Sequence, residues 1–102
     1  MPVDFRVTTV RFPAGTGGPR RQLATVAFGS NVVRSDAALK GFDIQFNNDE
    51  HPLLREEVHL AGVSISGNSV VVPVDIALRD NSGVFDDPYS ATVDLLVIAE
   101  VA

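Results

Sequence analysis

Apolar and polar residues alternate along most of the chain, and the alternation is clearest around Gly67-Asn68. Val63 and Ile65 alternate with serines before this dipeptide, and apolar residues occupy every second position after it. Gly-Asn favours a primed two-residue turn, whose twist matches that of paired strands. The pattern predicts a β-hairpin with one buried face, in which Ile65 lies opposite Val70 and Val63 lies opposite Val72.

Two irregularities in the alternation make predictions of their own. Apolar residues at positions 3, 5 and 7 are followed by apolar residues at positions 10 and 12. Because side chains along a strand keep a period of two, this phase change predicts a bulge in the first strand. Pro73 has no backbone N–H, which predicts that the second strand of the hairpin lies at a sheet edge or is bulged there.

Turn signals separate further strands, predicted at residues 23–28, 41–46, 54–60 and 92–101. Residues 32–40 fit either a short helix or a strand, and Gly41 with the pattern after it favours the strand. Glu56 falls on the apolar face of its strand, which predicts a position at the edge of the sheet.

The last strand is apolar on both faces, because Leu96 and Ile98 lie among the polar residues of its second face. A strand of this kind is central and covered from both sides. Alternatively, one face lies in the core and the other in a subunit interface.

Together these patterns predict an all-β fold, a single-domain antiparallel β-sandwich of six or seven strands that spans residues 1–102. A flattened barrel is the related alternative. A chain of 102 residues is the size of one domain. It contains no cysteine, which excludes disulfides, thiol catalysis and cysteine metal sites.

The net charge is −5 and the basic residues are scattered, which argues against nucleic-acid binding. No apolar run approaches the roughly 20 residues of a membrane span, so none is expected. The N-terminus lacks the basic start and apolar stretch of a signal peptide, so the expectation is a cytoplasmic protein or leaderless export, with the compartment left open.

No residue pattern assigns catalytic roles, and we do not predict an enzyme. The two histidines, His51 and His59, fall in a loop and on the solvent face of a strand. No serine lies in a nucleophile elbow. Acidic residues such as Asp49 and Glu50 are available as a carboxylate pair, but nothing in the sequence places two of them across a cleft.

A calcium site is the sharper chemical hypothesis. Hard oxygen ligands cluster at Asp80, Asn81, Asp86 and Asp87, and calcium accepts six to eight such oxygens in loops. The competing interpretation is a turn held by side-chain-to-backbone hydrogen bonds. Residues 47–51 form a similar cluster, and the two would make one acidic rim if both loops lie at the same end.

Carbohydrate binding is the third hypothesis, with His51, Arg55, Phe85 and Tyr89 as candidate ligand-binding residues. Loop polar groups would bond sugar hydroxyls, and an aromatic ring would stack on the sugar. Tyr89 has an alternative role, as a buried ring at a loop corner whose hydroxyl ties down the backbone.

The order of features resembles the H-type lectin domain. The features that carry the resemblance are residues 24–28 (ATVAF), an acid- and arginine-bearing middle and the closing strand at residues 93–99. The resemblance implies a compact β-sandwich, often trimeric, that binds sugars near subunit boundaries. The tryptophan typical of the family's late strand is missing, and no sugar-contact residue is carried over.

These observations predict a non-catalytic binding or assembly module that forms homo-oligomers and takes glycans as partners. The loops at residues 47–52 and 80–89 are its candidate ligand rim, where oligomerisation would add avidity to weak sites. The alternative is a structural subunit of a virion, appendage or protein shell, with residues 13–19 as a contact arm.

Overall fold

The computed structural model describes residues 2–47, 53–80 and 87–102, with the backbone alone for residues 53–55 and 80. Within these residues the chain forms seven β-strands and no helix, which confirms the all-β prediction. The strands are β1 (Val3–Gly15), β2 (Arg20–Ala27), β3 (Val32–Phe46), β4 (Leu53–Leu60), β5 (Ser64–Ser66), β6 (Ser69–Asp80) and β7 (Tyr89–Val101). The described part of the chain therefore has no helix that could span a membrane.

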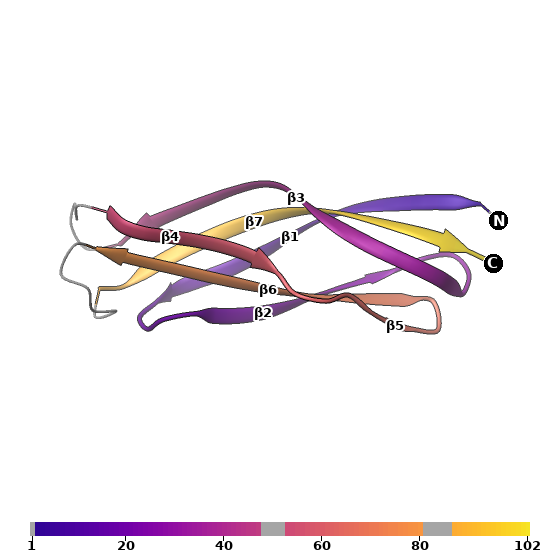
Figure 1. Cartoon of the computed structure of the whole chain (residues 1–102), viewed down its shortest axis with the longest axis horizontal. Coiled ribbons are helices and arrows are strands. Elements are labelled where there is room, and N and C mark those ends of the chain that lie inside the picture. Colours follow the sequence, from indigo (N-terminus) through magenta and orange to yellow (C-terminus); the bar gives the residue numbers. More distant parts are fainter. Residues whose placement is uncertain (1, 48–52, 81–86) are drawn as a thin grey trace.

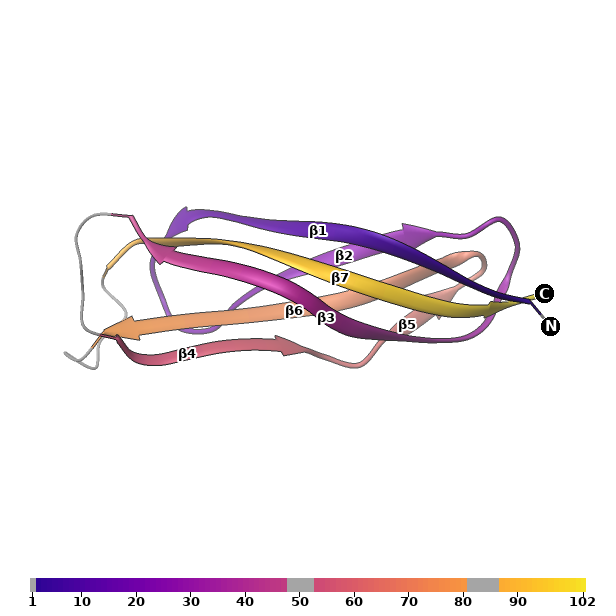
Figure 2. The same ribbon diagram turned by 90° about the horizontal axis from the view of Figure 1, so that it is seen from above.

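The strands form two antiparallel sheets that face each other, so the β-sandwich prediction is also confirmed. Sheet A has the order β1-β7-β3, and sheet B has the order β2-β6-β4, with β5 paired to β6. The sandwich is elongated, with extents of 50 × 18 × 17 Å. The two layers and both chain ends, which lie at one end of the long axis, are visible in Figures 1 and 2.

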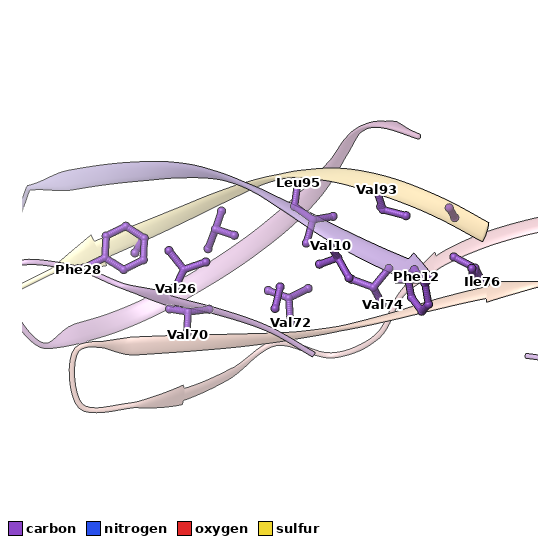
Figure 3. Packing of buried hydrophobic residues seen from close by; sticks show 14 of the residues in the cluster. Val10, Phe12, Val26, Phe28, Val70, Val72, Val74, Ile76, Val93 and Leu95 are labelled. Carbon is purple, nitrogen blue, oxygen red and sulfur yellow. The ribbon is translucent and has the colours of Figure 1, made fainter. Parts of the chain in front are cut away.

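The core is one apolar layer between the sheets, built mainly from the central strands β6 and β7. Every second side chain of these strands is buried, and strands β1 and β2 add further members to the layer (Figure 3). The largest side chains that the layer buries completely are Val70, Val72, Val74, Ile76, Tyr89, Val93, Leu95 and Val97. Burying one such side chain contributes about 1.5–3 kcal/mol, so this layer supplies the main stabilisation.

The predicted bulge in the first strand is wrong. Strand β1 pairs with β7 in unbroken register from Val3 to Phe12, and the register shifts only between Phe12 and Gly15. The phase change in the sequence instead reflects two faces, because Val10 and Phe12 point into the core while Val3 is on the outer face. The first half of β1 therefore exposes its apolar side chains.

The prediction for Pro73 is also wrong, since β6 is the central strand of sheet B and pairs with β2 through Pro73 without a register shift. Strand β4 ends at Leu60 and β5 begins at Ser64, so Pro73 lies beside the break between them. The Ala61 N–H donates to the Pro73 carbonyl at 3.0 Å, which shows that the backbone of Pro73 faces this break. A missing N–H is tolerated there because no ladder partner requires it.

The Gly67-Asn68 turn forms as predicted, and Gly67 has a φ of 59°, a conformation that favours glycine. Ile65 pairs with Val70, which confirms that part of the register. The ladder ends at Ser64 paired with Val71, so the predicted pairing of Val63 with Val72 is absent from the described ladder.

The turn is also bonded to the loop that follows β2. The Phe28 N–H donates to the Asn68 carbonyl at 2.8 Å, and the Val32 N–H donates to the Gly67 carbonyl at 2.9 Å. Because Val32 begins β3, its bond to Gly67 joins the two sheets at this end of the sandwich.

Residues 32–40 form a strand, which the sequence favoured over a short helix. Glu56 is exposed on β4 at the edge of sheet B, as predicted. Strand β7 is central in sheet A, also as predicted. Among the described residues its inner face is buried, whereas Ile98 on its outer face is 42% exposed. The alternative of a subunit interface on the outer face stays a prediction.

We predict that Leu95→Ala lowers the free energy of unfolding by about 2–5 kcal/mol, because it leaves a cavity in the buried layer. Leu23→Ala is the matched control, since Leu23 is 61% exposed and its truncation should change stability by about 0.5 kcal/mol or less. Urea denaturation followed by circular dichroism measures both. Equal losses in the two variants would contradict this description of the core.

Candidate functional site

Most of the site residues predicted from the sequence lie outside what the structure describes. Those wholly outside it are His51, Asn81, Phe85 and Asp86; Arg55 and Asp80 have only their backbone described, in β4 and β6. Asp87 is described and partly buried. The calcium and carbohydrate sites therefore stay predictions. Among described residues, no group of three or more histidine, aspartate or glutamate side chains could hold a metal ion.

Tyr89 is fully buried, and its hydroxyl donates to the Gly17 carbonyl at 2.8 Å. This is the role of a corner ring that ties down the backbone, weighed above as the alternative to sugar stacking. Burial raises the pKa of Tyr89 above its usual value, although the nearby Arg20 guanidinium opposes the change. The ring is not presented to solvent in this structure.

Arg20 completes this corner, and sequence patterning did not single it out. Its side chain lies on the inward side of β2, with the guanidinium carbon 4.7 Å from the centre of the Tyr89 ring. The guanidinium donates to the Tyr89 carbonyl at 2.8 Å and also to the Pro13 carbonyl. One cation thereby joins β1, β2 and β7.

The outer face of sheet A exposes the most extended apolar surface among the described residues. Val3, Phe5 and Val7 on β1 are 67%, 64% and 55% exposed, and Ile98 on β7 is 42% exposed. The β1–β7 register pairs Phe5 with Ile98 and Val7 with Leu96, so these side chains are neighbours across the strands. We call Val3, Phe5, Val7, Ala38, Leu96 and Ile98 the apolar face.

The apolar face is a row of neighbouring exposed apolar side chains, and the largest apolar patch on a monomer is often functional. Its centre carries no ionisable side chain except Asp36, which pairs with Ile98 across β3 and β7. The sequence contained a signal for the apolar face. The alternation that places Val10 and Phe12 inside also places the odd-numbered residues of β1 outside.

Charged groups at the margins of the apolar face already have partners within the chain. The Arg34 guanidinium pairs with the Glu100 carboxylate at one end, and this hydrogen bond holds the pKa of Glu100 below its usual value. At the other end the Thr9 hydroxyl donates to the Asp94 carboxylate at 2.6 Å. The charges at the Arg34–Glu100 end therefore offset each other, whereas Asp94 keeps its negative charge because a threonine hydroxyl carries none.

Shallow depressions on the described surface include two on sheet A and one on sheet B. One of about 310 Å³ overlaps the apolar face at Val3 and Ile98, and one of about 360 Å³ lies further along sheet A beside Arg11 and Asp43. The third, of about 450 Å³, lies on sheet B beside His59 and Asp75.

The chain matches no family model, no curated protein and no solved structure.

We predict that Arg20→Met lowers the free energy of unfolding by about 2–4 kcal/mol, because the carbonyls of Pro13, Gly15 and Tyr89 lose a charged donor. Arg21→Met is the matched control on the neighbouring position. Arg21 is exposed and bonds only the Asp75 carboxylate, at 2.6 and 2.9 Å, in the described structure, so its loss should cost much less. Denaturant titration of the two variants decides the comparison, and similar losses would contradict the role of Arg20.

We predict that stability falls as the pH is lowered below about 4. The pKa values of Asp4, Asp75 and Glu100 are held below their usual range by hydrogen bonds. A backbone N–H and the Arg6 side chain bond Asp4, Arg21 bonds Asp75, and Arg34 bonds Glu100. The stabilisation is therefore complete above the unfolded-state pKa and is lost as the pH falls through the folded-state values. Asp75→Asn should flatten part of this dependence when the melting temperature is measured against pH, and an unchanged profile would contradict it.

Proposed function

We propose that the protein is a non-catalytic assembly module that associates with further copies of itself through the apolar face. The observation that supports the proposal is the exposed row of apolar side chains formed by Val3, Phe5 and Val7 on β1 with Leu96 and Ile98 on β7. These side chains are not part of the core, to which β1 contributes Val10 and Phe12 and β7 contributes its opposite face.

The electrostatics of the face favour a second copy as the occupant. Two chains that each carry a net charge of −5 repel one another over most of their surface. The apolar side chains of the face carry no charge, and at one margin Arg34 offsets Glu100, so a second copy meets less repulsion there. Association also buries the apolar face of both copies, so each copy contributes apolar area that is removed from water.

Self-association would place several copies of the loops at residues 47–52 and 80–89 in one particle. That arrangement is what the carbohydrate hypothesis requires, because avidity compensates for weak single sites. It equally suits a building block of a larger shell, the alternative predicted from the sequence. Both depend on the same first step, the burial of the apolar face.

We expect Ile98→Ser to weaken self-association at least tenfold while leaving the melting temperature nearly unchanged, because Ile98 is exposed and contributes its burial only in the assembly. Leu23→Ser, on the outer face of sheet B and 61% exposed, is the matched control. Sedimentation velocity across a range of concentrations measures both. A wild-type chain that stays monomeric, or equal effects of the two substitutions, would contradict the proposal.

A further inference from the structure

Strand β1 is an edge of sheet A, and its open side carries a regular row of backbone groups. The Val101 N–H donates to the Pro2 carbonyl at 3.0 Å, so even-numbered residues of this segment direct their backbone groups toward β7. Odd-numbered residues consequently direct theirs toward the open side. The register is unbroken from Val3 to Phe12, which makes this a straight template for another strand.

At Phe5 the open backbone groups are occupied by the two flanking side chains. The Phe5 N–H donates to the Asp4 carboxylate at 2.8 Å, and the Arg6 guanidinium donates to the Phe5 carbonyl at 3.0 Å. Asp4 and Arg6 also bond each other at 2.9 Å. This clamp covers the groups that a neighbouring strand would use, and it confirms that they face away from β7.

The other edge of sheet A is built differently. Strand β3 shifts register between Val32 and Arg34 and again between Leu39 and Gly41, and Lys40 lies within the second irregularity. Bulges and an edge lysine are common protections against strand pairing. Strand β1 has neither in its first ten residues, so it is the more receptive edge.

We propose that the β1 edge pairs with the β1 edge of a second copy, antiparallel about a two-fold axis at Phe5. This inference rests on the proposed function and specifies one of its contacts. In this register each Phe5 lies opposite its symmetry mate, and Val3 lies opposite Val7 of the other copy. Asp4 of each copy lies opposite Arg6 of the other, so the segment at residues 3–7 is complementary to itself.

Other two-fold registers lack this match. If both copies keep their apolar faces on the same side, the axis must pass through a residue rather than between two. An axis at Asp4 or at Arg6 places identical charges opposite each other. An axis at Val7 moves Arg6 opposite a threonine and leaves Asp4 opposite Val10. Only the register centred on Phe5 pairs both charges.

When the ion pairs within each chain are exchanged for ion pairs between the two copies, no charge is left without a partner. The two ion pairs within the separate chains become two ion pairs across the strands. The Phe5 N–H and carbonyl, released by the clamp, bond their counterparts in the other copy, and the groups of Val3 and Val7 gain partners. The Arg6 guanidinium lies 4.9 Å from the centre of the Phe28 ring, so its position beside the edge is supported within its own chain.

The pair would also complete the apolar face. Side-by-side pairing joins the two faces into one six-stranded surface with roughly twice the apolar area of a single chain. A stable interface buries about 800 Å² per partner. The joined face therefore offers the proposed assembly a larger apolar contact than the face of one chain can.

Complementary charge variants test the pairing. Asp4→Arg makes both positions basic, and Arg6→Asp makes both acidic, so each variant alone sets like charges opposite each other at two places. We expect each to associate about tenfold or more weakly than the wild type. An equimolar mixture restores two opposite-charge pairs, and we expect mixed dimers close to wild-type strength by sedimentation velocity. Melting temperatures of the separate variants report whether each is folded.

The outcomes separate this inference from the proposed function. Weak separate variants with a strong mixture support the β1 pairing. If the wild type and both variants associate equally, and Ile98→Ser still weakens association, the pairing is overturned while the apolar face retains its role. A wild-type chain that is monomeric at every concentration overturns both.

A cross-link gives a second test that needs no charge change. The chain contains no cysteine, so Phe5→Cys introduces a single thiol. Opposite residues of a hydrogen-bonded antiparallel pair have Cα atoms about 5.5 Å apart, which suits a disulfide. We expect rapid disulfide dimers under mild oxidation for Phe5→Cys and few for Thr9→Cys, which lies on the same face but far from the axis. Equal cross-linking would overturn the Phe5-centred register.

Discussion

The apolar layer between β6 and β7 is the constraint on which the rest of the structure depends. Valines, isoleucine and leucine at every second position of these strands are fully buried against the opposite sheet. Because side chains alternate strictly along a strand, this layer decides which face of every paired strand points outward. The outward direction of Val3, Phe5 and Val7 follows from the inward direction of Val10 and Phe12. Their apolar character therefore needs an explanation other than folding.

The sequence was sufficient for the features that local chemistry determines. The Gly67-Asn68 turn, the pairing of Ile65 with Val70 and the central position of β7 were all predicted from residue type and alternation. The bulge in β1 and the edge position for Pro73 were wrong for a common reason. Each was inferred from one strand alone, whereas the answer depends on the neighbouring strands. Pro73 is tolerated in a central strand because the ladder beside it is interrupted.

The candidate site shows the same limit. Sequence reasoning favoured polar loops because ligand chemistry is visible in residue types, and those loops lie largely outside the described residues. The apolar face was less visible, since its members come from β1, β3 and β7 and become neighbours only through the register. The Arg20 corner was missed because an arginine next to Arg21, just after a glycine- and proline-rich loop, resembles an ordinary surface position. Only the pairing geometry places it against Tyr89.

The bond between Val101 and Pro2 has a mechanical consequence. The first residues of β1 and the last residues of β7 are adjacent, at the same end of the long axis (Figure 1). A force that draws the two chain ends apart would load the hydrogen bonds between these strands one at a time. The hydrogen bonds of the ladder would break in sequence, at a lower force than if all of them were loaded in parallel. A tension applied through both ends would thus peel β1 away first, before the buried layer beneath it yields.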